Sequence, residues 1–354
     1  MPASETGPTL AATTLSLVDL PSESRSEEEM YLYVAGQVPV RQVFADGESL
    51  VFARREGKPL VLLAGHTDTV PAQGNLPGRI EDGWVVGLGA SDMKGGLAVM
   101  VELARWVELQ AELAYDVAFL FFPREELGPA ENPLPALFEQ VPLIDEAALV
   151  ICLEPTDNAL QLGCLGNLNA RVVFEGRSAH SARPWLGVNA VKVAFDGLGE
   201  VLELEPRDAV VGGLLFREVL SVTQIHGGIA TNVIPARVEA TINFRYAPDR
   251  SPLDAEQRVR ELVGRDVEIL SNSPPAHVAS GSPAVEALRA AGDLEVQPKQ
   301  AWTNVADFAA RGLDAVNFGP GATRYAHTAD ERVEVAALER CYDVLQRFLL
   351  GTVP

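Results

Sequence analysis

The sequence has few cysteines, few basic residues and no long apolar run. Its three cysteines, Cys152, Cys164 and Cys341, are scattered and odd in number, which argues against a disulfide framework or a CxxC metal site and fits a reducing compartment. The chain has only 28 Lys and Arg residues but 49 Asp and Glu residues, so it lacks the positive electrostatic field that attracts nucleic acid or an anionic membrane. No stretch approaches roughly 18 uninterrupted apolar residues, and no basic segment leads into an apolar core near the start. We therefore expect a cytoplasmic protein with neither a signal peptide nor a membrane span.

Short apolar runs bounded by turn residues recur along the chain, and helical stretches lie between several of them. The runs, which are typical of buried strands, occupy residues 50–54, 59–66, 116–123, 147–155 and 314–320. Between two of these runs, residues 93–113 keep the i, i+3, i+4 spacing of one buried helix face. This alternation predicts an α/β domain with a mostly parallel sheet and with ligands at the carboxyl ends of its strands.

The middle of the chain has a different pattern. Residues 237–246 alternate strictly between apolar and polar, which is typical of an antiparallel strand with one wet face. The neighbouring segments predict a ferredoxin-like α+β domain in the order β-α-β-β-α-β: strand 167–175, helix 188–202, strands 218–226 and 237–246, helix 252–264 and strand 266–271. We therefore predict a catalytic domain in two parts, 1–166 and 273–354, with an inserted lid or dimerisation domain at 167–272.

Polar residues directly follow several of the predicted strands. In "VLLAGHTDTVP" (61–71), His66 and Asp68 lie two residues apart, so both side chains leave the strand on the same face. A carboxylate beside an imidazole commonly orients a histidine that binds a metal ion. The other polar residues of this kind are Asp92 at a glycine-rich helix start, the adjacent Glu125 and Glu126, Glu154, and His327 in a loop. Because the strand ends of such a sheet meet at one crevice, the coincidence predicts a single site.

Each of these residues also has a simpler interpretation: Asp92 can cap a helix, the paired glutamates can form a solvated loop, and Glu154 can be a strand-end charge. Charge balance favours a two-metal site instead. In that arrangement one divalent ion is bound by His66 and Glu154, a second by Glu126 and His327, and both by Asp92. Three carboxylates and one hydroxide then balance two dications, and each ion keeps an open position for solvent. Asp68 remains to orient the imidazole of His66, and Glu125 remains to act as general base.

Five motifs carry these residues in a fixed order: "GHTDTVP" (65–71), "GASDMKGG" (89–96), "REELG" (124–128), "LEPT" (153–156) and "AHTADE" (326–331). Together they resemble the M20 family of co-catalytic metallopeptidases and amidohydrolases, over nearly the whole chain. The resemblance implies a zinc-peptidase-like catalytic domain with an inserted lid, and two divalent metal ions, zinc or alternatively cobalt. It implies the same ligands and the same base as the charge argument. It also implies a cis peptide bond between Asp92 and Met93.

Further segments are similar to the succinyl-diaminopimelate desuccinylase branch of that family, in its shorter form. They include "GNLPGR" (74–79), "SAHSARPWLGVNA" (178–190), "NVIP" (232–235) and "APDRS" (247–251). This similarity implies hydrolysis of N-succinyl-LL-2,6-diaminopimelate to succinate and LL-diaminopimelate, in lysine biosynthesis. The sequence departs from the longer form of the enzyme at "LGCLGN" and "WTNVAD", which bears on how substrate carboxylates are bound. The alternatives are another M20 N-acyl-amino-acid deacylase, a metallo-carboxypeptidase or dipeptidase, or a binding protein without activity.

A substrate with several carboxylates needs cations and hydrogen-bond donors. Arg245 on the polar face of strand 237–246 can clamp a carboxylate, and Asn232 and Thr303 can add hydrogen bonds, although a surface arginine, a turn asparagine and a loop threonine are the plain alternatives. His180 is the predicted donor to the oxyanion, and its alternative is a strand-end histidine that caps a turn. The resemblance implies that this histidine comes from the partner subunit of a homodimer formed through the inserted domain. We thus expect a small-molecule N-acyl amino acid as substrate, and neither nucleic acid nor membrane as partner.

Overall fold

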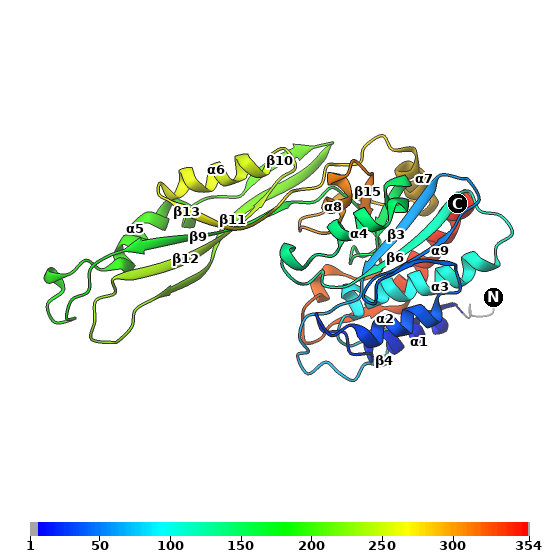
Figure 1. Ribbon diagram of the computed structural model, residues 1–354, viewed down its shortest axis with the longest axis horizontal. Coiled ribbons are helices and arrows are strands. Elements are labelled where there is room, and N and C mark those ends of the chain that lie inside the picture. The colour runs from blue at the N-terminus through cyan, green and yellow to red at the C-terminus, as the bar shows by residue number, and fades with distance from the viewer. Residues whose placement is uncertain (1–5, 353–354) are drawn as a thin grey trace. The chain divides into compact units, whose positions relative to one another are not determined.

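The computed structural model describes residues 6–352, which form two compact units (Figure 1). Within these residues, the first unit comprises 6–162, 279–297 and 307–352, and the second comprises Gly163–Val278 and Pro298–Ala306. The last of these segments differs from the prediction that all of 273–354 lies in the catalytic domain. It joins the second unit because Gln300 hydrogen-bonds the backbone of residues 215 and 217, and Nε1 of Trp302 donates to the backbone oxygen of Pro274 at 3.1 Å.

The first unit is built on an eight-stranded sheet in the order β1-β2-β6-β3-β7-β15-β8-β14. The strands are β1 (Gln42–Ala45), β2 (Leu50–Arg54), β3 (Leu60–His66), β6 (Asp116–Phe122), β7 (Ala147–Cys152), β8 (Leu160–Leu162), β14 (Val296–Pro298) and β15 (Ala315–Asn317). The central strands β6, β3, β7 and β15 run parallel, and antiparallel strands extend the sheet on both sides. The predicted α/β fold with its parallel core is confirmed.

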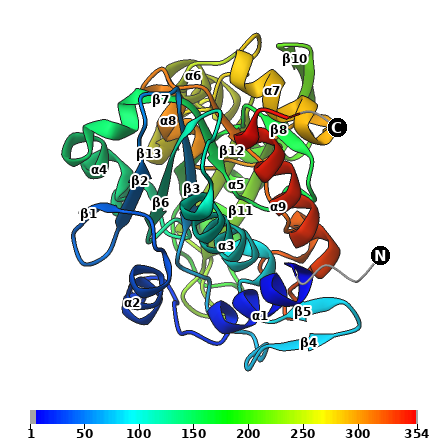
Figure 2. The same cartoon turned by 90° about the vertical axis from the view of Figure 1, so that its right-hand side faces the viewer.

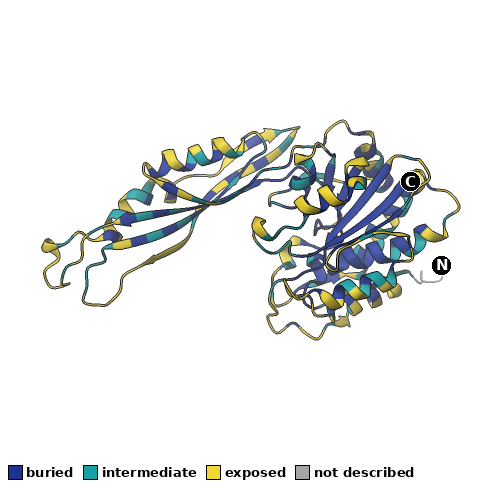
Figure 3. Cartoon of the chain, viewed as in Figure 1, coloured by how far each residue is buried: buried dark blue, intermediate teal, exposed yellow. Residues whose placement is uncertain are grey.

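Helices cover this sheet and bury its centre. β3 and β6 are buried along their whole length (Figure 3), which explains why their sequences are continuous apolar runs. The helices α1 (Thr6–Val18), α3 (Gly95–Leu109) and α9 (Val335–Leu350) pack against one another along one face (Figure 2). The others are α2 (Glu28–Gln37), α4 (Leu134–Gln140), α7 (Pro283–Gly292) and α8 (Val305–Ala310). Among the described residues, every helix is too short or too polar to span a bilayer.

A small antiparallel sheet brings the C-terminal part of the first unit to the N-terminal part. Its strands are β4 (Arg79–Glu81), β5 (Trp84–Val86) and β16 (Arg332–Glu334), in the order β16-β5-β4. β16 pairs with β5 through residues 332–334. The loop that precedes β16 is therefore held beside the turn that follows β5.

The second unit is an antiparallel sheet with two helices on one face. Its elements are β9 (Gly166–Glu175), α5 (Ala190–Leu202), β10 (Arg207–Val211), β11 (Leu214–Gly227), β12 (Arg237–Tyr246), α6 (Pro252–Val263) and β13 (Val267–Ser273), with sheet order β10-β11-β12-β9-β13. The predicted β-α-β-β-α-β order is confirmed, with β10 as an added strand. The turn before β11 is made by Gly212 and Gly213 at φ 58° and 81°, which is the signature of a tight hairpin.

Candidate metal centre

Three of the central parallel strands bring three of the five predicted metal ligands, and the predicted base, to one edge of the sheet. His66 is the last residue of β3, Glu125 and Glu126 follow β6, and Glu154 follows β7. Because β6, β3 and β7 are parallel neighbours, their carboxyl ends lie side by side. Asp92 reaches the same place from the turn Ala90–Lys94 just before α3, where its own backbone is extended (φ −126°, ψ 94°).

His327 reaches the cluster from the loop before β16. Both His327 and Arg124, which precedes the paired glutamates, have φ of 61°, a left-handed conformation that residues with a Cβ seldom adopt. The loop that carries His327 is tied down by Gln73, whose Nε2 donates to the backbone oxygen of His327 at 2.9 Å. Side-chain placement in this loop thus depends on contacts between distant segments.

Asp92 lies between two histidine–carboxylate pairs. Its Oδ1 is 3.2 Å from Nε2 of His66, and its Oδ2 is 3.5 Å from Nε2 of His327. Nε2 of His66 lies 4.0 Å from Oε1 of Glu154, and Nε2 of His327 lies 2.9 Å from Oε1 of Glu126. Both trios, His66–Asp92–Glu154 and Asp92–Glu126–His327, keep their ligand atoms within 4.8 Å of one another. The structure thus brings together all five residues that the sequence predicted as ligands, and Asp92 belongs to both trios.

Asp68 holds the surrounding backbone in place. It is buried, and its backbone oxygen and Oδ1 lie 3.1 Å and 3.4 Å from Nδ1 of His66. Its Oδ1 accepts a hydrogen bond from the backbone nitrogen of Glu125 at 2.9 Å, and its Oδ2 accepts one from that of Glu126 at 3.1 Å. The hydroxyl of Ser24 donates to Oδ2 at 2.7 Å, a contact that no motif in the sequence indicated. One carboxylate therefore orients the imidazole and fixes both glutamates.

Glu331 plays a similar part for the Asp92 turn. It is buried, and its carboxylate accepts hydrogen bonds from the backbone nitrogens of Gly89 at 2.9 Å, Ser91 at 3.1 Å and Asp92 at 3.0 Å. The only sign of this role in the sequence is the position of Glu331 at the end of "AHTADE". The peptide between Asp92 and Met93 is cis, as the family resemblance implied.

The two histidines show that this cluster favours positive charge. Burial alone would lower the pKa of His66, but hydrogen bonds to Asp68 and Asp92 outweigh it and raise that pKa well above its usual value. Hydrogen bonds to Asp92 and Glu126 raise the pKa of His327 to about 10. Both shifts have the same cause, which is an excess of carboxylates that stabilises positive charge in this cluster. A donor set of two imidazoles and three carboxylates that attracts cations in this way fits two divalent metal ions.

Glu125 has the properties of an acid–base group. Burial raises its pKa well above the usual value for a glutamate, and the neighbouring carboxylate of Glu154 raises it further. A carboxyl group with a raised pKa can accept a proton and return it near neutral pH, which an ordinary glutamate does poorly. Glu125 is therefore distinguished chemically from Glu126, whose carboxylate is paired with His327.

His180 and Asn232 lie close together in the second unit. His180 forms a β-bridge with Val233, and the backbone nitrogen of Ser181 donates to the backbone oxygen of Asn232 at 2.9 Å. Nδ1 of His180 accepts a hydrogen bond from the backbone nitrogen of Ala182 at 3.1 Å. A neutral ring whose Nδ1 is an acceptor carries its proton on Nε2, so this side chain is a hydrogen-bond donor at its outer nitrogen.

Arg245 and Thr303 also belong to the second unit, in different surroundings. Arg245 lies on the polar face of β12, half-buried, with its Nε donating to Oδ1 of Asn243 at 3.1 Å. Thr303 is buried, and its backbone oxygen lies 3.9 Å from Sγ of Cys164. Burial of the threonine fits a packing role at least as well as the predicted contact with substrate.

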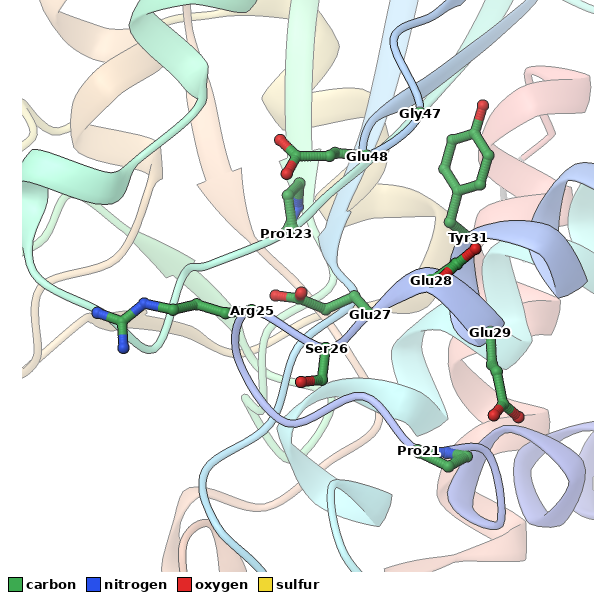
Figure 4. Close-up of a pocket in the computed structure, with 10 residues that line it drawn as sticks. All are labelled: Pro21, Arg25, Ser26, Glu27, Glu28, Glu29, Tyr31, Gly47, Glu48 and Pro123. Carbon is green, nitrogen blue, oxygen red and sulfur yellow. The ribbon is translucent and has the colours of Figure 1, made fainter.

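A cavity of about 570 Å³ lies beside the start of α2 and the end of β6 (Figure 4). It is lined by Pro21, Arg25, Ser26, Glu27, Glu28, Glu29, Tyr31, Gly47, Glu48 and Pro123. None of the residues predicted for the site lines it. Four glutamates would repel an anionic substrate, so we do not assign this cavity to substrate binding.

Comparison with known families and sequences places the site in context. The family model described as "Peptidase family M20/M25/M40" matches residues 62–351. A Mycobacterium tuberculosis protein with the provisional name succinyl-diaminopimelate desuccinylase DapE is 38% identical over 346 residues, 96% of this chain and 97% of the relative. The succinyl-diaminopimelate desuccinylase of Corynebacterium glutamicum is 33% identical over 349 residues, 95% of each chain.

Solved structures share the fold at lower sequence identity. A tripeptidase from Staphylococcus aureus superposes with a TM-score of 0.80 at 18% identity, covering 97% of each chain. The Bacillus subtilis YXEP protein, described as a dinuclear metal-binding peptidase, superposes with a TM-score of 0.70 at 14% identity, covering 98% of each chain. At these identities the likeness concerns the fold alone.

Proposed function

The chain belongs to peptidase family M20/M25/M40, and we propose that it hydrolyses N-succinyl-LL-2,6-diaminopimelate to succinate and LL-diaminopimelate, a cytoplasmic step of lysine biosynthesis. Family membership makes it a metal-dependent hydrolase of amide bonds. The observation that carries the proposal is Asp92 between two histidine–carboxylate pairs, with an acid–base glutamate beside them. The choice of acyl group is supported by relatives named as desuccinylases that are 33% and 38% identical over nearly the whole chain.

Two divalent metal ions, zinc in our proposal, fit the five ligands. His66 and Glu154 would hold one, Glu126 and His327 the other, and Asp92 both. When bound, such ions lower the pKa of water and polarise the scissile carbonyl.

Side chains of the protein transfer the protons, position the reacting groups and bind the substrate. Glu125 takes a proton from the attacking water and returns it to the leaving amine. Asp68 keeps Glu125 in place through the backbone hydrogen bond of 2.9 Å and orients His66. Nε2–H of His180, supplied by the partner subunit, donates to the oxyanion of the tetrahedral intermediate. Arg245, Asn232 and Thr303 bind carboxylate and amide groups of the substrate away from the reacting bond.

A kinetic comparison of acyl groups tests the proposed substrate. We expect kcat/KM for N-succinyl-LL-2,6-diaminopimelate to exceed that for the N-acetyl analogue by at least about a hundredfold, because the acetyl group lacks the carboxylate that a cationic side chain would bind. Both substrates are assayed with the zinc-loaded enzyme, and a chelator-treated sample is the control. Equal or better hydrolysis of the acetyl compound would instead identify another N-acyl-amino-acid deacylase of the family.

We also propose a homodimer formed through the second unit. β11 pairs with β12 along Val219–Gly227, but no other strand of the described residues covers the opposite edge of this segment. Ile225 on β11 is 57% exposed, and on α5 Val191 is 48% and Phe195 72% exposed. An uncovered strand edge with exposed apolar side chains is a template for pairing with a second copy about a two-fold axis.

Mixing two inactive variants tests whether His180 acts across that dimer. A hybrid dimer pairs one Glu125→Gln chain with one His180→Ala chain. One of its two sites should then have an intact Glu125 from the second chain and an intact His180 from the first. Random exchange makes half of the dimers hybrids, so we expect about a quarter of wild-type activity. Mixtures of either variant with the Glu125→Gln/His180→Ala double variant are the control and should stay inactive. The trans role is excluded if the first mixture also stays inactive although native mass spectrometry detects hybrids.

A further inference from the structure

Asparagines gather beside Arg245 on the polar face of the sheet in the second unit. Alternation along β12 puts Asn243 and Arg245 on one face, opposite the apolar side chains that pack under α5 and α6. On the neighbouring strand β9, Asn169 is paired with Asn243, and Asn167 is paired with Arg245. These four side chains form one polar cluster where the two strands meet.

The amide of Asn243 is held in one orientation by its neighbours. Its Nδ2 donates to Oδ1 of Asn167 at 2.8 Å and to Oδ1 of Asn169 at 2.9 Å. Asn169 in turn donates from its own Nδ2 to Oγ of Ser271 at 3.0 Å, so its oxygen is the atom that faces Asn243. A flipped Asn243 amide would place its oxygen against these two oxygens. The oxygen of Asn243 therefore points toward the guanidinium.

Arg245 is left with an unused pair of outer nitrogens. Its Nε donates to the oxygen of Asn243 at 3.1 Å, and within residues 6–352 no carboxylate forms an ion pair with it. Partial burial lowers the pKa of the guanidinium, because it removes water from around the charge. A carboxylate that approaches the two outer nitrogens end-on would compensate that charge with two parallel hydrogen bonds.

We propose that Asn243 is a positioning residue that holds Nε of Arg245 and so presents both outer nitrogens of Arg245 to a carboxylate of the substrate. The inference rests on the proposed function, because it requires a substrate that carries a carboxylate away from the scissile amide. A side chain held in its binding orientation loses little conformational freedom when the ligand arrives, so the amide cluster acts on affinity rather than on the chemical step.

Steady-state kinetics of the zinc-loaded enzyme test this inference. With N-succinyl-LL-2,6-diaminopimelate, Asn243→Ala should raise KM on the order of tenfold and change kcat by less than about threefold. Asn243→Asp is nearly isosteric, and its carboxylate would pair with Arg245 in place of the substrate, so KM should rise at least as much. Thr241→Ala, on the same face of β12, is the matched control and should leave KM unchanged.

A double variant separates positioning from a general loss of structure. Since Asn243 acts through Arg245, Asn243→Ala/Arg245→Ala should have the KM of Arg245→Ala alone. Calorimetric titration with succinate provides a readout without turnover, and Asn243→Ala should weaken succinate binding while Thr241→Ala should not. Wild-type KM and succinate affinity in both Asn243 variants, or additive effects in the double variant, would overturn the inference. Failure of the proposed function has a different signature, which is the absence of turnover of the succinyl substrate by the wild-type enzyme.

Discussion

Replacement of Glu125 by glutamine is expected to lower kcat by about 10²–10⁴-fold while both metal ions stay bound. Glutamine keeps the size of the side chain but cannot accept a proton from water. The backbone nitrogen of Glu125 donates to Asp68 at 2.9 Å, and this anchor is independent of the side chain. Turnover of the succinyl substrate gives the loss of rate, and atomic absorption gives the metal content per chain.

The adjacent Glu126→Gln variant is the matched control. It makes the same chemical change one residue away, but Oε1 of Glu126 lies 2.9 Å from Nε2 of His327 in the proposed second metal position. We expect Glu126→Gln to lose metal, whereas Glu125→Gln should not. Near-wild-type turnover in Glu125→Gln, or a loss of metal as large as in Glu126→Gln, would contradict the assignment of the base.

Asp92→Asn should reduce activity to below about a thousandth of wild type and reduce the metal content from two ions to one or none per chain. The two carboxylate oxygens of Asp92 face different histidines, His66 at 3.2 Å and His327 at 3.5 Å. An amide offers one oxygen and one NH₂ group, and the NH₂ group does not bind a metal ion. The variant therefore cannot serve both positions.

Asp82→Asn is the control for this charge change. Asp82 is exposed in the turn between β4 and β5 and has a φ of 48°, a conformation that asparagine adopts readily. Its metal content and activity should equal those of the wild type. Two tightly bound ions in Asp92→Asn, measured by the same method, would be incompatible with a bridging carboxylate.

The convergence of the ligands could be predicted because it follows from strand order. His66, Glu126 and Glu154 each come after a continuous apolar run, and parallel strands place such positions on one edge. The antiparallel sheet of the second unit could also be predicted from the sequence, because apolar and polar residues alternate without exception along residues 237–246. The local pattern of apolar residues was therefore sufficient to predict both sheets.

Contacts between distant segments could not be predicted in this way. Ser24 contacts Asp68 across 44 positions, and Glu331 contacts the Asp92 turn across 239 positions or more. Local hydrophobic periodicity indicates neither contact. The packing of Pro298–Ala306 with the second unit depends on hydrogen bonds from Gln300 and Trp302 to remote backbone atoms. The hairpin at Gly212 and Gly213 had a local signal and was missed because the flanking strand is short.

The ligands of the two proposed metal positions are synthesised at different times. His66, Asp92 and Glu154 all precede the segment Gly163–Val278, so a nascent chain that ends at residue 162 already contains every ligand of the first position. The second position requires His327, which follows the whole second unit. The turn that carries Asp92 is held by Glu331, which also follows the whole second unit, so the backbone of both proposed positions depends on the C-terminal part of the chain.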